Sequence, residues 1–155
     1  MAYGKSRYRR EWEPTEFDTG TAAIELRKRV VRYVMNENFV PKRWRFVDAI
    51  PAIQEAEQIR KIIIGANSLK TNTNSLEYNI KALQRRIQMQ GNVIALCDNF
   101  DLKIQDIVAD CQEATFKNIA PLTDGNRDVR RLCVNWQKSD VSKLRDLLSQ
   151  TQKPE

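Results

Sequence analysis

The chain has 155 residues, of which 41% are hydrophobic and 30% charged, with a formal net charge of +6. This size suits one domain with a single core, and the composition argues against a disordered or disulfide-stapled protein. The absence of histidine excludes His-containing catalytic triads and the commonest general base and metal ligand, whereas the positive charge permits a polyanionic partner.

Residues 1–18 are predicted to form a flexible arm in which aromatic and basic side chains alternate. The stretch "YGKSRYRREW" carries three aromatic rings and four cations. It suits either an arm that orders on a polyanion or partner, or an untethered tail. No apolar segment follows these cations, as a secretory signal would require, and no run is long enough for a membrane span. We expect a cytoplasmic protein without membrane contact.

The first helix is predicted over residues 19–36, followed by a connection at 35–40. Its apolar residues recur at steps of three and four, and basic residues fill much of the remainder. The apolar positions are Ala23, Leu26, Val30 and Val34.

The second helix is predicted to open at Pro41, whose fixed φ and missing N–H suit a first helical turn, and to end near Ala66 or Leu69. Pro51 should bend it near Val47, because proline removes one backbone hydrogen bond. The expected core face consists of Phe46, Ile50, Ile53, Ala56, Ile59, Ile63 and Ala66.

The third helix has the clearest periodicity. Asn74 is the predicted N-cap, with Glu77 three residues later as in a capping box. Gln90 is the one polar gap in the apolar register, and Gly91 weakens the helix by about 1 kcal/mol without necessarily ending it. The register consists of Leu76, Ile80, Leu83, Ile87, Ile94 and Cys97, and Ile104 and Val108 continue it.

The fourth helix keeps heptad spacing through Ile119, Leu122, Val129, Cys133 and Trp136. Within it, Pro121 and the sequence "TDG" at 123–125 argue for a break or a kink. Residues 140–155 are predicted to form a short amphipathic extension with Asp140 as its cap and a frayed end.

These segments predict an all-α protein, an antiparallel up-down four-helix bundle over residues 19–139 with long second and third helices. No stretch shows the two-residue alternation of a strand. The three cysteines lack paired C-x-x-C spacing and fall at or near apolar helical positions. We therefore expect buried thiols, no metal and no cofactor.

Cations on the solvent faces are candidate contacts for the phosphates of RNA or DNA. Ladders at helical spacing can meet phosphates, although a solvated surface paired with nearby acids is the alternative. The candidates are Arg27, Lys28, Lys42, Arg43, Arg45, Lys81, Arg85, Arg127, Arg131 and Lys138.

Two tryptophans could contribute to packing or to base stacking. Trp136 shares the apolar register of the fourth helix, which favours a core or interface role. Trp44 lies in "VPKRWRF", between cations and the first expected core residue, and suits either a lid over the core or a stacking platform.

Four stretches in order resemble a known family. They are "VPKRWRF" opening the second helix, "GANS" closing it, "EYNIKALQRR" opening the third and "DVRRLCVNWQKSD" ending the fourth. Their order and spacing are similar to those of the four-helix-bundle proteins of the accessory variability determinant family, which occur with diversity-generating retroelements. The similarity covers about residues 22–143, and the region "DLKIQDIVADCQEATFKN" and the "TDGN" stretch depart from it.

This resemblance implies a non-enzymatic, homo-oligomeric protein, a basic pentamer that binds template RNA and the reverse transcriptase to support mutagenic cDNA synthesis. Relatives of the bundle also occur away from any reverse transcriptase, so the fold alone does not settle the role. The positions that match the family motifs are Pro41, Arg43, Phe46, Ala66, Asn67, Ser68, Val129, Trp136, Lys138, Ser139 and Asp140.

The sequence therefore carries two principal hypotheses. The first is the retroelement accessory protein. The alternative is a structural or interaction bundle of a phage or mobile element, whose basic faces meet an acidic protein partner. An enzyme is disfavoured, because the sequence presents no nucleophile with a general base.

Overall fold

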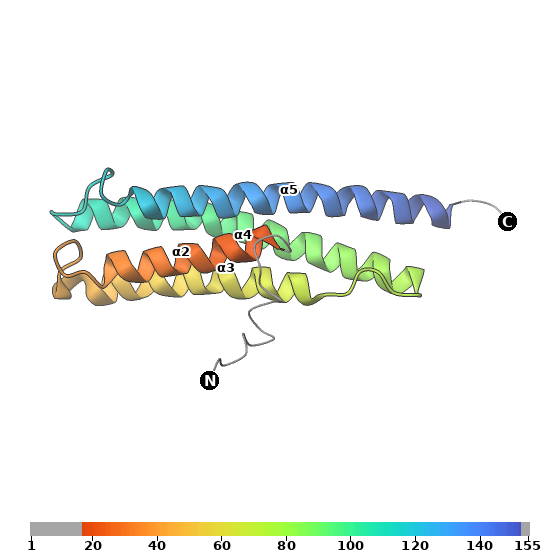
Figure 1. Ribbon diagram of the computed structural model, residues 1–155, viewed down its shortest axis with the longest axis horizontal. Helices are drawn as coiled ribbons and strands as arrows, with labels where there is room; N and C mark the ends of the chain where they lie inside the picture. The colour runs from red at the N-terminus through yellow and green to blue at the C-terminus, as the bar shows by residue number, and fades with distance from the viewer. Residues whose placement is uncertain (1–16, 153–155) are drawn as a thin grey trace, which may run out of the picture.

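The computed structural model describes residues 17–152 and places most of them in four α-helices (Figure 1). The predicted arm at 1–18 lies outside the described residues, apart from its last two, and so does the end of the predicted tail. The helices are α2 (Asp18–Val34), α3 (Ile50–Ser68), α4 (Leu76–Asp110) and α5 (Ala120–Thr151).

Each helix packs against two neighbours, α2 against α3 and α5, and α4 against α3 and α5. Successive helices run in opposite directions in Figure 1. The predicted all-α, antiparallel four-helix bundle is thus confirmed. Its core contains apolar side chains from every helix, and those that are fully buried include Leu26, Val30, Ile59, Ile63, Val93, Phe100, Leu122 and Val129.

The helices differ in length, and this gives the molecule its shape. α4 has 35 residues and α5 has 32, whereas α2 has 17 and α3 has 19. The long helices are therefore the third and fourth, and not the second and third as predicted, because α5 continues past Asp140 and irregular turns precede α3. As Figure 1 shows, the paired α4 and α5 extend beyond α2 at one end. In that part of the bundle, α4 and α5 pack against each other without cover from α2.

The entry to α3 is not a regular α-helix. Pro41 precedes a single 3₁₀ turn, η1 (Lys42–Trp44), and a π-helical turn, η2 (Arg45–Ala49). A π turn holds more residues than an α turn, so it shifts which side chains face inward. The buried face of this segment starts with Asp48 and Ala49 and continues with Ala52.

Phe46 was expected to begin the core, and that prediction is wrong for this chain. Its side chain is 81% exposed, and the following Val47 is 54% exposed. The π turn before Ile50 breaks the three- and four-residue rhythm that would have carried Phe46 onto the buried face.

Pro51 affects the backbone near Val47, where a bend was expected. Proline at this position has no N–H to donate to the Val47 carbonyl four residues earlier. The ammonium of Lys103 on α4 donates to that carbonyl instead, at 2.7 Å, and to the Asp48 carboxylate at 3.0 Å. A lysine from the next helix therefore occupies the carbonyl that proline leaves free, and it neutralises a fully buried acid.

The start of α4 differs from the prediction by one residue. Ser75, not Asn74, is the N-cap, and its hydroxyl oxygen accepts a hydrogen bond from the Tyr78 N–H at 3.2 Å. Asn79 then fastens the preceding turn, since its side chain bonds both the N–H and the carbonyl of Thr73. The helix runs through Gly91 to Asp110, as the continued register suggested.

α5 is continuous where a break was considered. It begins at Ala120, so Pro121 lies in the first turn, where a missing N–H costs nothing. The "TDG" stretch is helical, and Gly125 is a close-approach position. A Cβ there would lie 3.2 Å from Cδ1 of Leu26, which explains why a residue without a side chain suits this point on the α2–α5 contact.

Asp140 is not the cap of a separate extension, because α5 passes through it without interruption to Thr151. Its carboxylate is fully buried and accepts two hydrogen bonds from Arg86 on α4, both at 2.6 Å. Gln90 donates a third at 2.7 Å. These three hydrogen bonds, two of them from the positively charged Arg86, allow an aspartate to lie in the middle of a helix and face inward.

Candidate nucleic-acid interface

The clearest basic feature is a row of cations along the outer face of α5, which we call the α5 stripe. Its members are Arg127, Arg131, Lys138 and Arg145, all exposed. They are separated by four, seven and seven residues, so at about 100° per residue they lie within about 40° of one another on the helix surface. The row spans about 27 Å at 1.5 Å per residue.

Most cations of the α5 stripe are free to contact a ligand. Arg127, Lys138 and Arg145 form no ion pair within residues 17–152, and Arg131 lies 3.5 Å from the exposed Asp128. The opposite side of α5 is buried through Leu122, Val129 and Cys133 among others. Packing of that side orients the stripe toward solvent.

Arg145 belongs to the α5 stripe because α5 is continuous, whereas a separate extension over residues 140–155 would set it apart from the other cations. A signal was present, since Arg145 follows Lys138 by seven residues and Lys138 follows Arg131 by seven. In a continuous helix, a spacing of seven residues places these cations on the same face.

The candidates on α4 are divided. Lys81 forms an exposed ion pair with Glu77 at 3.0 Å, whereas Arg85, one turn later, is exposed and forms no ion pair within the described chain. Surface pairs at this spacing contribute little to stability. Lys81 can therefore exchange Glu77 for a phosphate at small cost.

The candidates on α2 also divide. Arg27 points to α3, where its Nε lies 2.6 Å from the carboxylate of Glu57. Arg60 bonds the same carboxylate, and these hydrogen bonds and charges, that of Arg60 first, lower the pKa of Glu57. Arg27 is thus a tie between helices, while Lys28 remains exposed.

The cluster in "VPKRWRF" is partly neutralised. Lys42 and Arg45 both approach Oε1 of Glu37 in the preceding loop, at 3.7 and 3.4 Å. Arg43 is exposed. Trp44 is half-buried and packs against the core, which fits a lid.

The remaining motif residues are placed as follows. Asn67 is exposed in the last turn of α3. Trp136 is half-buried on α5. The Phe17 ring packs edge-on against it, with ring centres 4.8 Å apart, and the Arg86 guanidinium lies 5.5 Å from the centre of the tryptophan ring. Trp136 therefore packs at the edge of the core and is not presented as an open stacking surface.

The buried charges of Asp48 and Asp140 were not predicted from the sequence. Burial raises the pKa of Asp48, and Lys103 acts against this rise. The partners of Asp48 and Asp140 lie 55 and 54 residues away in sequence, so no local pattern names them. The available signals were polar residues at apolar register positions, namely Gln90 and Asp140.

The three thiols are buried, as predicted. Burial raises the pKa of Cys97 and of Cys133 to about 12 and that of Cys111 to about 11, so each thiol is neutral near pH 7. Among residues 17–152, no group of three or more acidic or cysteine side chains is placed to hold a metal ion.

No family model, curated protein or solved structure matches this chain. No helix in the described part of the chain combines the length and the hydropathy needed to cross a bilayer.

Proposed function

We propose that this chain is a non-enzymatic nucleic-acid-binding bundle that holds structured RNA along the α5 stripe. The observation that carries the proposal is the alignment of four exposed cations on one face of a rigid helix, with three of them free of ion pairs in the described chain. Each cation that meets a phosphate releases condensed counterions, which supplies affinity without base contacts.

The biological setting that we propose is that of a retroelement accessory protein, which also binds a reverse transcriptase and acts as a homo-oligomer, a pentamer in the family that it resembles. Support for this step comes from the order of the four sequence motifs. Several protomers would place several α5 stripes around one RNA, and affinity would rise through their joint contacts.

RNA binding measured against salt concentration tests the proposal. Replacing Arg127, Lys138 and Arg145 with Gln should weaken binding of a structured RNA and should lower the slope of log K against log salt by about 2 to 3. The matched control replaces Lys61, Lys70 and Lys117 with Gln, which removes the same charge from exposed positions off the stripe.

The control should bind with nearly the affinity of the parent chain. Equal losses in both variants would show that net charge, and not the stripe, attracts the RNA. Absence of binding by the parent chain at moderate salt would refute the proposal.

A second function has one observation in its favour. The exposed Phe46 and Val47 next to the cations of "VPKRWRF" suit a protein surface with acidic and apolar groups, because a phosphate backbone needs no apolar contact. In this alternative the chain is an interaction bundle of a phage or mobile element. A partner that stays bound after nuclease treatment, and is lost on Phe46→Ser, would favour it.

A further inference from the structure

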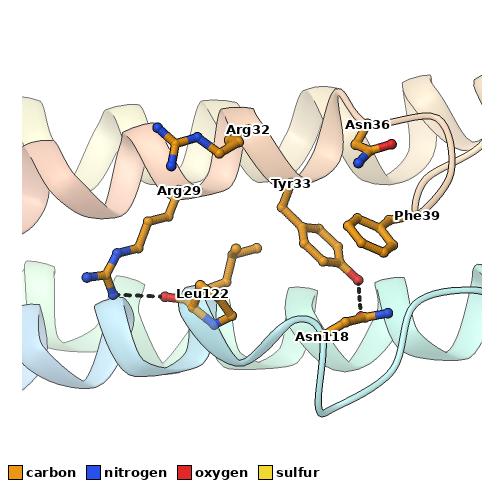
Figure 2. A pocket seen from close by; sticks show the side chains of 8 residues that line it. Arg29, Arg32, Tyr33, Asn36, Phe39, Asn118 and Leu122 are labelled. Carbon is orange, nitrogen blue, oxygen red and sulfur yellow. Dashed lines mark hydrogen bonds between the residues drawn. The ribbon is translucent and has the colours of Figure 1, made fainter.

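A pocket lies between α2 and the start of α5 (Figure 2). Its volume is about 290 Å³. Ligand sites in proteins commonly begin at about 300 Å³, so this pocket suits a single ring system with a small substituent. Pro121 and Leu122 contribute to it from the first turn of α5. Pro121 precedes Arg127 by six residues, so the two lie about 9 Å apart along the helix axis and about 120° apart around it, and the pocket is on a different side of α5 from the α5 stripe.

The inner part of the pocket is apolar and aromatic. Tyr33 and Phe39 are stacked, with ring centres 4.7 Å apart and planes 9° from parallel, and Leu122 is fully buried beside them. The Tyr33 hydroxyl donates to Oδ1 of Asn118 at 2.6 Å, as Figure 2 shows. Tyr33 is only 6% exposed and each stacked ring covers one face of the other, so Phe39 is the more accessible ring of this apolar wall for a flat ligand.

The outer part of the pocket is positively charged. Arg29 is held in place, since it donates to the Pro121 carbonyl at 3.2 Å and to Glu25 at 3.3 Å. Arg32 is exposed and forms no ion pair within residues 17–152. None of the residues that line the pocket is acidic. Arg32 is therefore available to an anion at the mouth.

Asn36 adds a polar group to the same edge. Its side-chain oxygen accepts a hydrogen bond from the Asn38 N–H at 3.0 Å, which leaves the amide NH₂ as a donor toward the pocket edge. A ligand that satisfies all three parts has a flat ring, an acceptor on that ring and a negative group within reach of a guanidinium.

We propose that this pocket binds one nucleotide, with its base against the Tyr33 and Phe39 wall and its phosphate at Arg32. The inference rests on the proposed function for its source, a nucleotide of bound RNA turned out of the strand. Protein modules that recognise single-stranded RNA place unstacked bases on aromatic side chains in this way. A free mononucleotide has the same chemistry and is the other source to test.

Three single variants test the site by affinity. Arg32→Gln removes the free cation, and Asn36→Asp places a carboxylate at the pocket edge; both positions are exposed, so folding should be unaffected. Lys61→Gln is the matched control, because Lys61 is exposed on α3, does not line the pocket and is not one of the candidate phosphate contacts. The first two should weaken binding of a single-stranded RNA oligomer by about 5- to 20-fold, and the control by less than about 2-fold.

Photocrosslinking gives the direct measurement. An RNA oligomer containing 5-iodouridine should crosslink to Tyr33 or Phe39, as read by mass spectrometry, and Phe39→Leu should reduce the yield while circular dichroism confirms the fold. RNA that binds but crosslinks only elsewhere would overturn the pocket and leave the α5 stripe standing.

Titration with adenosine monophosphate and uridine monophosphate separates the two sources. Saturable binding of either one, lost in Asn36→Asp, together with no binding of RNA, would support a free-nucleotide site and refute the proposed RNA function. RNA crosslinking without mononucleotide binding would support a site for RNA only. Absence of both would overturn the inference.

Discussion

The pair of Arg86 and Asp140 is the residue-scale feature with the largest expected effect on stability. Both side chains are buried, with Arg86 8% and Asp140 0% exposed, and two hydrogen bonds of 2.6 Å join them. A buried pair adds little beyond what a well-packed apolar pair would, but removal of one member leaves an uncompensated charge. The pair joins α4 to α5 inside the protein, so loss of either member should be costly.

Asp140→Asn should lower the free energy of unfolding by about 3 to 5 kcal/mol, because Arg86 loses its counter-charge inside the protein. Urea denaturation measures this, with the exposed Asp146→Asn as the matched control, for which a change within about 0.5 kcal/mol is expected. The double variant Arg86→Met, Asp140→Leu should recover much of the loss. A double variant no more stable than Asp140→Asn would show that the charges themselves are required.

At the scale of elements, the turns that precede α3 decide which side chains of this segment face the core. The π turn over Arg45–Ala49 turns Phe46 outward, and Lys103 on α4 takes the carbonyl that Pro51 leaves without a donor. The apolar character of Phe46 is therefore not used in the core of the single chain. Phe100 on α4, which is fully buried, provides the comparison.

Phe46→Ala should change the free energy of unfolding by no more than about 0.5 kcal/mol, whereas Phe100→Ala should cost about 3 to 5 kcal/mol. Chemical denaturation at several protein concentrations measures both. A loss for Phe46→Ala that grows with protein concentration would contradict the expectation, and it would place Phe46 in a contact between copies of the chain.

The stability of the whole molecule should depend on pH through its three thiols, which share one core. The pKa of Cys97 and Cys133 is about 12 and that of Cys111 about 11 in the fold, whereas an unfolded thiol has a pKa of about 8.5. Between these values the native state binds more protons than the unfolded state, so stability falls as pH rises.

The free energy of unfolding should therefore decline from about pH 8.5 toward pH 11, with no contribution from the thiols below about pH 7.5. Urea denaturation across this range measures the decline. In the triple variant with Ala at positions 97, 111 and 133, the free energy of unfolding should fall less steeply with pH than in the parent chain. An unchanged slope would mean that other groups, such as the lysines, cause the alkaline loss.

The sequence could predict the helices and most core positions because helix formation and burial leave a local signature. Apolar residues at steps of three and four mark the buried face of each helix, and Val30, Ile63, Cys97 and Val129 all lie where that pattern put them. The cysteines were correctly expected to be buried for the same reason.

Local sequence patterns did not predict the position of a side chain that pairs with a residue far away in the chain. Asp140 reads as a helix cap in "QKSD", yet its burial depends on Arg86, and Arg27 reads as a surface cation, yet Glu57 holds it against α3. Two such charges attract only when packing brings them within a few ångströms, and sequence spacing carries no information about that distance.

By itself, then, the sequence determined an all-α bundle, its buried stripes and an excess of positive charge, since each follows from composition and short-range periodicity. The tertiary structure alone decided which cations are free, that Phe46 faces outward, and that α2 and α5 enclose a pocket. Those outcomes depend on helix continuity and on contacts between segments far apart in the chain, and such contacts exist only after the helices have packed.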